Sequence, residues 1–239
     1  LEDCVWEMAH KDALEVVHAP QTLGFYSRIF LVPKASDSWR PVIDLSCLNK
    51  WVDCRKFKME TPRSVLASIS PNQYLTSIDL KDAYFQIPIH PLSRHLLRFV
   101  WKDQTYQFSA LPFGLNTAPS LFTEVMKTVA RIAHKQGVHV HMYLDDWLIN
   151  EDSLEQSEIS TQKLVALCQH LGITLNREKS ELVPTQKLIY LGMEIDTSLG
   201  LVFPTMKRIS KFLRILETFM EDPSPPALHW LILLGHMLL

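Results

Sequence analysis

The sequence predicts an α+β fold, in which short strands pair as hairpins and amphipathic helices pack on the resulting sheets. The first observation is a set of runs rich in β-branched and aromatic residues, separated by turn signals, at 25–45, 74–111 and 138–150. The second is the helical spacing of apolar residues at 120–134, 153–171 and 205–220. With 239 residues, 47% of them hydrophobic, the chain can bury a large core as one domain or two subdomains.

Composition narrows the class of protein. The net charge of −2 gives no global basic signature, which counts against a pure nucleic-acid-binding module and leaves only local patches for such binding. The four cysteines show no C-x-x-C spacing, so neither a zinc knuckle nor a disulfide framework is indicated, and a reducing, intracellular compartment is favoured.

No membrane segment is predicted, because no signal peptide opens the chain and the longest apolar run, 228–239, is interrupted by histidines and too short to span a bilayer. The unfinished apolar helix pattern at that end, with Leu1 at the other, leads us to expect a piece of a longer polypeptide.

The central stretch is 138–150, V-H-V-H-M-Y-L-D-D-W-L-I-N, which predicts a hairpin with Asp145 and Asp146 at or beside its turn. Aspartate is common in turns, so turn chemistry alone is one interpretation. A second strand-like run begins at Tyr74 and ends at Asp79. If the two strands are neighbours, Asp79 and Asp145 face one another, and such a pair calls for hard divalent ions, most naturally Mg²⁺.

Two histidines, His139 and His141, stand two apart before this turn and so share a face. They could ligate a metal, but no suitable third ligand lies nearby in sequence, and ordinary core or surface positions are favoured.

The first half of the chain contains two basic regions. After a weakly helical entry segment, strands at 25–32 and 39–45 predict a hairpin carrying Arg28, Lys34 and Arg40, which is either a solvated face or a lid that closes on a polyphosphate. The patch C-R-K-F-K-M-E-T-P-R at 54–63 suits a nucleic-acid backbone groove or, equally, a solvated linker; its candidate contacts are Arg55, Lys56 and Lys58.

Helix and strand signals continue to the end of the chain. Thr61-Pro62 predicts the start of a short helix to about residue 69, and 106–111 is expected to pair with 96–101. The 120–134 helix is expected to bury Leu121, Phe122, Val125, Met126 and Val129, and the 153–171 helix to bury Leu154, Ile159, Leu164, Leu167 and Leu171. Short strands are predicted at 182–183, 188–195 and 201–203, with a tight bend at Gly192.

The last predicted helix, 205–220, has two distinct faces. One is expected to be buried and contains Ile209, Phe212, Leu213, Leu216 and Phe219. The other presents Lys207, Lys211 and Arg214. This row of cations suits either a phosphate backbone or simple solvation, and the sequence weighs the two evenly.

Six motifs in series resemble the reverse transcriptase domain of retroelements. They are W-R-P-V-I-D-L-S-C-L-N-K (39–50), L-T-S-I-D-L-K-D-A-Y-F-Q-I-P-I-H-P (75–91), Y-Q-F-S-A-L-P-F-G-L-N-T-A-P (106–119), Y-L-D-D (143–146), G-I-T-L-N-R-E-K-S (172–180) and L-G-M-E-I-D (191–196). The match covers about residues 20 to 220. The residues of the L-P-F-G-L and Y-L-D-D-W-L-I segments resemble most those of DIRS-like (tyrosine-recombinase) retroelements, with gypsy-like and pararetroviral enzymes as relatives. The turn at 102–104 lacks the glycine that relatives often show.

The resemblance implies a right-hand polymerase fold. It implies an entry segment at 1–20, fingers at 21–73, palm at 74–90, fingers and palm at 91–119, palm at 120–204, and the truncated start of a thumb at 205–239.

The resemblance also implies a site. Asp79, Asp145 and Asp146 would hold two Mg²⁺ ions, or Mn²⁺, and because neighbouring strand residues point opposite ways, Asp79 and Asp145 are expected to be the principal ligands. Lys34 and Arg40 are expected to bind the triphosphate, and Lys179 to protonate pyrophosphate. Tyr84 is expected to contact the sugar and exclude a 2′-hydroxyl, and Phe113 and Gly114 to line the nucleotide and template pocket. The expected primer grip consists of Leu191, Gly192, Met193 and Glu194. For Tyr84, a core position is the alternative.

The implied function is RNA- and DNA-directed DNA polymerisation within a retroelement polyprotein, with an RNA template, a DNA primer and template, and deoxynucleoside triphosphates (dNTPs) as partners and a ribonuclease H domain expected downstream. A second hypothesis is a catalytically silent nucleic-acid-binding remnant. A third, an RNA-dependent RNA polymerase, is disfavoured by Tyr84.

Overall fold

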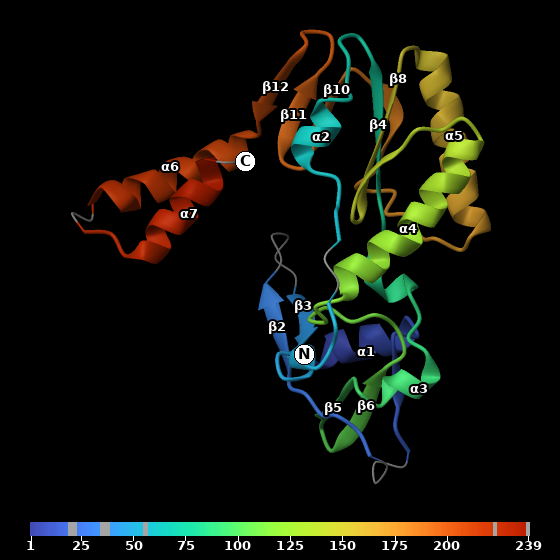
Figure 1. Ribbon diagram of the computed structural model, residues 1–239, viewed down its shortest axis with the longest axis vertical. Coiled ribbons are helices and arrows are strands. Elements are labelled where there is room, and N and C mark those ends of the chain that lie inside the picture. The colour runs from blue at the N-terminus through green and yellow to red at the C-terminus, as the bar shows by residue number, and fades with distance from the viewer. Residues whose placement is uncertain (19–22, 34–38, 55–56, 222–223, 238–239) are drawn as a thin grey trace.

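The computed structural model describes residues 1–18, 23–33, 39–54, 57–221 and 224–237 (Figure 1). The helices are α1 (Glu2–His10), α2 (Pro62–Leu66), α3 (Pro91–Arg94), α4 (Ala118–Lys135), α5 (Leu154–His170), α6 (Met206–Glu221) and α7 (Ala227–Met237), with 3-10 turns η1 (Leu48–Lys50) and η2 (Ala83–Gln86). The strands are β1 (Leu14–Val16), β2 (Ile29–Pro33), β3 (Trp39–Ile43), β4 (Tyr74–Asp79), β5 (Arg98–Trp101), β6 (Gln104–Phe108), β7 (His141–Tyr143), β8 (Asp146–Glu151), β9 (Glu181–Thr185), β10 (Lys187–Tyr190), β11 (Met193–Asp196) and β12 (Leu201–Pro204).

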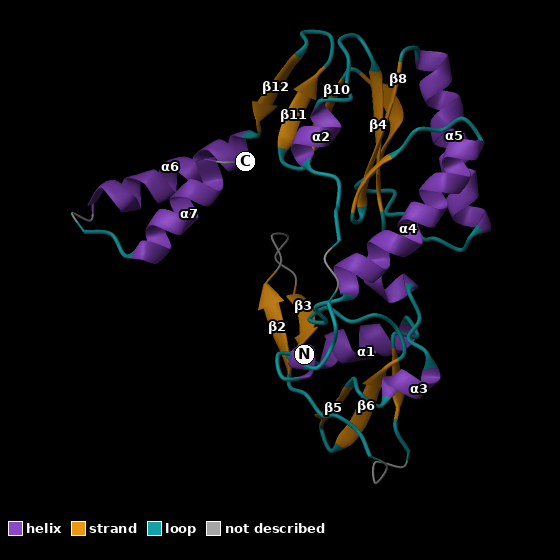
Figure 2. Cartoon of the chain, viewed as in Figure 1, coloured by secondary structure: helices purple, strands orange, loops and turns teal. Residues whose placement is uncertain are grey.

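The main sheet has the strand order β7-β8-β4-β9, with every neighbouring pair antiparallel. Helices α4 and α5 lie along one side of it (Figure 2), and their apolar residues form one core with Ile78, Trp147 and Ile149 of the strands. The mixture of antiparallel sheets and helices confirms the predicted α+β class.

The buried faces of α4 and α5 differ from those predicted. In α4, Leu121 and Val125 are exposed, and the buried stripe is Ala118, Phe122, Met126, Val129 and Ala133. In α5, Leu164 and Leu167 are buried as predicted, but Leu154, Ile159 and Leu171 are exposed.

Instead, α5 buries small hydroxyl residues against the sheet. Thr161 Oγ1 lies 2.7 Å from Thr76 Oγ1 of β4, and Ser160 Oγ donates to Glu151 Oε1 of β8 at 2.6 Å. Ser160 and Thr161 are stable inside because each has a hydrogen-bond partner on the sheet, whereas the buried Ser157 Oγ has none within the described residues. Apolar periodicity alone could not identify these buried polar positions.

A second group of elements packs at the other end of the molecule (Figure 1), where β1, β6 and β5 form a sheet next to the β2–β3 hairpin and α1. Strand β1 was not predicted. It pairs with β6 in the register Leu14 with Phe108 and Val16 with Tyr106. The β5–β6 turn, for which the sequence offers no glycine, places both Lys102 and Asp103 at positive φ.

Strands β10, β11 and β12 form a separate antiparallel sheet, so the single strand predicted over 188–195 is a hairpin. Its turn contains Leu191 and Gly192, both at positive φ, as the predicted bend at Gly192 requires. The short helix α2 begins with a capping box between Thr61 and Ser64, as its N-cap signal predicted.

Helices α6 and α7 pack on each other and stand to one side of the rest of the chain (Figure 1). The rings of Phe219 and Trp230 meet edge to face at 4.4 Å. The prediction of a buried face on α6 was too strong: α7 packs on this helix, but Leu213 is 49% exposed and no α6 side chain is fully buried. Within the described residues, none of the helices combines the length and apolar character that crossing a bilayer requires.

Candidate active site

Three carboxylates gather at one end of the main sheet. Strand β4 ends at Asp79, which stands opposite Asp146, the first residue of β8. Asp145 lies in the two-residue turn between β7 and β8, preceded by Leu144 at φ 53°. The backbone N–H of Leu80 donates to the carbonyl of Asp145 at 2.9 Å, which ties the turn to the end of β4. The two acidic strands are neighbours, as the sequence argument supposed, but the residue opposite Asp79 in the register is Asp146 and not Asp145.

Burial, and to a smaller extent repulsion from neighbouring carboxylates, disfavours the charged forms of Asp79 and Asp146. Burial raises the pKa of Asp146 to about 6, with further increases from the charges of Asp145 and Asp79 and an opposing effect from Lys179. Burial also raises the pKa of Asp79, against the charge of Lys179 and a hydrogen bond from Asn176. The site is therefore rich in negative charge, and Lys179 is the cation that offsets the charge of both Asp79 and Asp146.

A cavity of about 490 Å³ opens beside these carboxylates. Asp79, Asp145 and Lys179 lie on its wall, whereas Asp146 does not. Arg40, Tyr84 and Phe113 also line this cavity, so residues from five separate motifs share one space.

An aromatic cluster forms part of the wall. The ring of Tyr84 lies 5.0 Å from that of Phe113 and 5.5 Å from that of Phe122, and the guanidinium carbon of Arg40 lies 4.8 Å above the Phe113 ring. Burial raises the pKa of Tyr84, the charge of Asp145 adds to this, and Arg40 opposes it. Tyr84 is thus both a packed residue and a neighbour of the charged groups.

Gly114 keeps Phe113 in place against β3. Its φ is +114°, and a Cβ added there would lie 2.2 Å from the carbonyl oxygen of Ile43. The Ile43 N–H donates to the Phe113 carbonyl at 3.4 Å, and Asn49 Nδ2 donates to the Gly114 carbonyl at 2.9 Å. Only glycine permits this close approach of the two backbones.

Two residues that support Asp79 were not singled out from the sequence. The Asp79 N–H donates to Ser180 Oγ at 3.0 Å, and Ser180 Oγ donates to the Asn176 carbonyl at 2.7 Å. The Asn176 N–H donates to the Asp79 carbonyl at 2.8 Å. Asn176 and Ser180 both belong to the G-I-T-L-N-R-E-K-S motif, and membership of this motif was the sequence signal that could have identified them.

The expected primer grip is the tip of the β10–β11 hairpin. Leu191 and Gly192 form the turn, Met193 is buried, and Glu194 forms an ion pair with Lys187 at 2.7 Å. Next to this turn, the Tyr190 hydroxyl donates to the Asp146 carbonyl at 2.9 Å, which connects the hairpin to the carboxylates.

Apart from Arg40 and Lys179, the basic site candidates lie away from this cavity or outside the described residues. Lys34, Arg55 and Lys56 fall outside the described residues. Lys58 is exposed in a groove against α4. Lys207, Lys211 and Arg214 are all exposed on α6.

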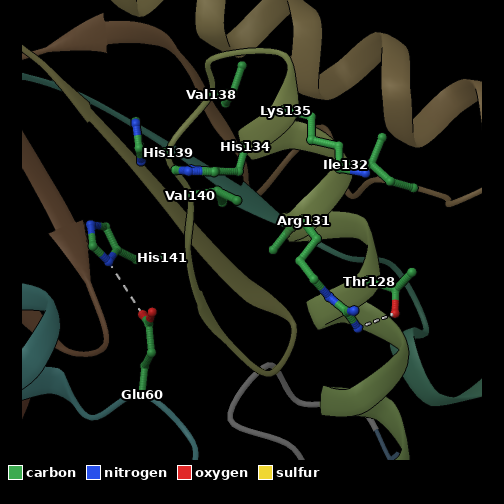
Figure 3. A pocket seen from close by; sticks show the side chains of 11 residues that line it. Glu60, Thr128, Arg131, Ile132, His134, Lys135, Val138, His139, Val140 and His141 are labelled. Atoms are coloured by element: carbon green, nitrogen blue, oxygen red, sulfur yellow. Dashed lines mark hydrogen bonds and ion pairs between the residues drawn. The ribbon is translucent and has the colours of Figure 1, made fainter.

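The candidate metal ligands His139 and His141 lie in a different cavity, of about 570 Å³, between the C-terminal half of α4 and the segment leading into β7 (Figure 3). His139 packs edge to face on His134 at 4.4 Å. His141 Nδ1 lies 3.5 Å from Glu60 Oε2, the pair joined by a dashed line in Figure 3, and its Nε2 lies 3.0 Å from Ser68 Oγ. The histidines therefore have ordinary packing and polar partners.

The chemistry of the three aspartates suits a hard divalent cation. They supply only carboxylate oxygens, and burial, followed by the charges of the neighbouring aspartates, raises the pKa values of Asp79 and Asp146, a cost of ionisation that such an ion would relieve. Within the described part of the chain, no three His, Cys, Asp or Glu side chains already converge as metal ligands. Binding would therefore draw the carboxylates together.

The whole arrangement is similar to solved polymerase structures. The foamy viral protease-reverse transcriptase in complex with dsDNA matches with a TM-score of 0.80 and 19% identity over 99% of this chain and 46% of that one. The same viral protein in complex with an RNA/DNA hybrid matches with a TM-score of 0.76 and 20% identity over 97% of this chain and 29% of that one. The chain therefore has the right-hand polymerase fold.

Sequence relatives are viral polyproteins. The Gag-Pol polyprotein of Walleye dermal sarcoma virus is 28% identical over 77% of this chain and 11% of its own length. The Gag-Pol polyprotein of Gibbon ape leukemia virus is 32% identical over 66% of this chain and 10% of its own length. The genome polyprotein of Petunia vein clearing virus is 28% identical over 81% of this chain and 9% of its own length. The chain thus spans a small part of each relative, and its DIRS-like placement stays a prediction.

The family model for reverse transcriptase (RNA-dependent DNA polymerase) matches residues 32–195. That segment contains the three carboxylates, Tyr84, Phe113 and Lys179, and it makes up most of the chain. The chain belongs to the reverse transcriptase family.

Proposed function

We propose that this chain is an RNA- and DNA-directed DNA polymerase that adds deoxynucleotides to a primer 3′ end, as part of a retroelement polyprotein. The observation that carries the proposal is that Asp79 and Asp145 share one cavity with Lys179, Arg40 and Tyr84. These are carboxylates for metals, cations for a triphosphate and an aromatic side chain for a sugar.

The proposed metals are two Mg²⁺ ions, with Mn²⁺ as a substitute, held by Asp79, Asp145 and Asp146. When bound, such ions activate the primer hydroxyl and neutralise charge on the departing pyrophosphate. The protein places two carboxylates on the cavity wall and supports Asp79 through Ser180 and Asn176. This support fixes the backbone of Asp79 before any ion binds.

The remaining residues act on the nucleotide. Arg40, together with Lys34 of the undescribed segment, would bind the triphosphate, since a guanidinium offers two parallel donors to phosphate oxygens. Tyr84 would lie under the sugar and exclude a 2′-hydroxyl, and Phe113 and Gly114 would shape the pocket. Lys179 would give a proton to the departing pyrophosphate.

The proposed partners follow from similar proteins. The foamy viral enzyme is described in complex with dsDNA and with an RNA/DNA hybrid. We infer that this chain takes an RNA template and a DNA primer and template, with dNTPs as substrates. A ribonuclease H domain would lie downstream in the full polypeptide.

The proposed division of the chain keeps the predicted boundaries. Its parts are an entry segment at 1–20, fingers at 21–73, palm at 74–90, fingers and palm at 91–119, palm at 120–204 and the start of a thumb at 205–239. The primer grip would be the turn Leu191 to Glu194, which lies next to the Tyr190–Asp146 hydrogen bond.

Extension of a DNA primer on an RNA template tests the proposal. The parent chain should extend the primer with Mg²⁺ and dNTPs, and the Asp145→Asn variant should not. A chain that binds primer and template without extending the primer would instead be the silent nucleic-acid-binding remnant.

A further inference from the structure

Helix α1 forms part of the cavity that contains the carboxylates. Cys4, Glu7, Met8 and Lys11 line the same cavity as Asp79. All four precede residue 32, where the family match begins. Figure 1 shows α1 next to β3 and below the start of α4, and buried Met8 belongs to the same core as Ile43 of β3. The segment whose role the sequence left unassigned is therefore a wall of the site.

An ion pair joins this wall to the segment that carries Tyr84. Lys11 Nζ lies 2.8 Å from Asp82 Oδ2, and Lys11 also pairs with Glu7 one helical turn earlier. The Lys11 and Asp82 side chains are 31% and 33% exposed. Partial burial reduces screening by water and salt, so this pair is stronger than a fully exposed one.

Asp82 occupies a position on which Tyr84 depends. It has the left-handed backbone angles φ 50° and ψ 41°, and it is the residue at which η2 begins. Its carbonyl accepts a hydrogen bond from Phe85 N–H at 2.8 Å. Tyr84 is the second residue of η2, so the direction of its ring follows from how Asp82 is held.

The left-handed conformation is disfavoured for a residue with a Cβ, although aspartate tolerates it better than most. An external interaction that fixes the Asp82 side chain therefore stabilises the whole turn. Lys11 supplies that interaction from an element distant in sequence.

We propose that the Lys11–Asp82 ion pair is a positioning device for Tyr84, through which helix α1 sets the selection of deoxynucleotides over ribonucleotides. This inference rests on the proposed polymerase function. Lys11 acts through Asp82 and η2 and is not itself a catalytic residue.

The chain offers a matched control. At its other end, α1 forms a second ion pair with the body of the protein, Glu2 Oε2 to Lys102 Nζ at 2.6 Å. Neither residue lines the carboxylate cavity. Loss of this pair loosens the same helix without touching Asp82.

The experiment measures kcat/KM for a dNTP and for the matching ribonucleotide during primer extension. The variants are Lys11→Met, Asp82→Asn, Lys11→Arg, the control Glu2→Gln and the reference Tyr84→Val. Asparagine tolerates the left-handed conformation, so Asp82→Asn breaks the pair with the least change in backbone preference.

Lys11→Met and Asp82→Asn should each lower the selectivity for the dNTP about fivefold, the effect of a partly screened ion pair. Lys11→Arg should retain most of the selectivity, and Glu2→Gln all of it. Thermal unfolding of every variant separates this effect from a general loss of stability, which would lower the melting temperature and leave the selectivity unchanged.

Two outcomes overturn the inference while leaving the proposed function intact. In one, the parent extends primers, Tyr84→Val changes the selectivity, and both Lys11→Met and Asp82→Asn keep the parent value. In the other, Glu2→Gln lowers the selectivity as much as Lys11→Met does, which assigns the effect to helix α1 as a whole. A parent chain that extends no primer overturns the proposed function and this inference with it.

Discussion

Asp79 and Asp146 stand directly opposite each other in the antiparallel pair formed by β4 and β8. Like charges in this position destabilise a sheet. The chain nevertheless adds a third carboxylate, Asp145, in the adjoining turn. The raised pKa of Asp146 reflects this conflict together with burial. Three carboxylates at one end of a sheet are unfavourable without a counter-ion, and a bound cation would explain why they are placed there.

The first prediction concerns pH. Asp146 has a pKa of about 6 in the folded chain, above the ordinary value of 3.8. The folded state therefore binds this proton more tightly than the unfolded state. Its stabilising contribution is complete below about pH 4 and is lost as the pH rises through 6, by at most about 3 kcal/mol and less where water screens the group.

Replacing Asp146 with Asn should remove this pH dependence. We expect urea unfolding without divalent ions to show Asp146→Asn gaining stability over the parent between pH 4 and pH 7. Curves of stability against pH that stay parallel for the two chains would show that Asp146 does not titrate in this range.

The second prediction concerns Gly114. Gly114→Ala places a Cβ against the Ile43 carbonyl oxygen, whereas Gly137, also at positive φ (+79°), has no atom within 4 Å of an added Cβ. Gly137→Ala should cost about 1 kcal/mol from backbone strain alone. Gly114→Ala should cost about 2 kcal/mol more, because backbone must move. Equal unfolding free energies for the two variants would contradict this account of the Phe113 loop.

The third prediction concerns Tyr84. Tyr84→Val should relax selection against ribonucleotides by about tenfold or more, because discrimination by shape is lost with the ring. Tyr84→Phe keeps the ring and should keep the selectivity. The measurement is the ratio of kcat/KM for the two nucleotides. If Tyr84→Val lowers only the melting temperature, Tyr84 is a core residue packed on Phe113 and Phe122 and nothing more.

The fourth prediction concerns the exposed cations of α6. Replacing Lys207, Lys211 and Arg214 together by Gln should weaken binding of a primer–template duplex. The slope of log affinity against log salt should become shallower by about 0.9 for each phosphate that the variant no longer neutralises. Lys163→Gln, which removes an exposed cation from α5, is the control. An unchanged salt slope in the triple variant would show that this row is only solvated.

The sequence predicted those parts of the fold that depend on local signals. The Asp145 turn, the cap at Thr61 and the bend at Gly192 follow from local residue preferences. The pairing of β4 with β8 was suggested once both strands were recognised, because β4 ends and β8 begins with an aspartate.

The remaining features depend on contacts between distant segments. The buried face of α5 is polar because Thr161 meets Thr76, and no pattern within α5 indicates such a partner. Strand β1 has three residues and exists because β6 pairs with it. The place of Lys11 in the site likewise depends on Asp82, 71 positions later in the numbering.

The most direct test of the account is extension of a labelled DNA primer on an RNA template with Mg²⁺ and all four dNTPs, comparing the parent with Asp145→Asn. Asparagine keeps the size of the side chain and removes its charge, so folding should be retained. We expect extension by the parent and none by the variant. Equal extension by both chains would contradict the assignment of Asp145, and binding without extension by the parent would contradict the polymerase function.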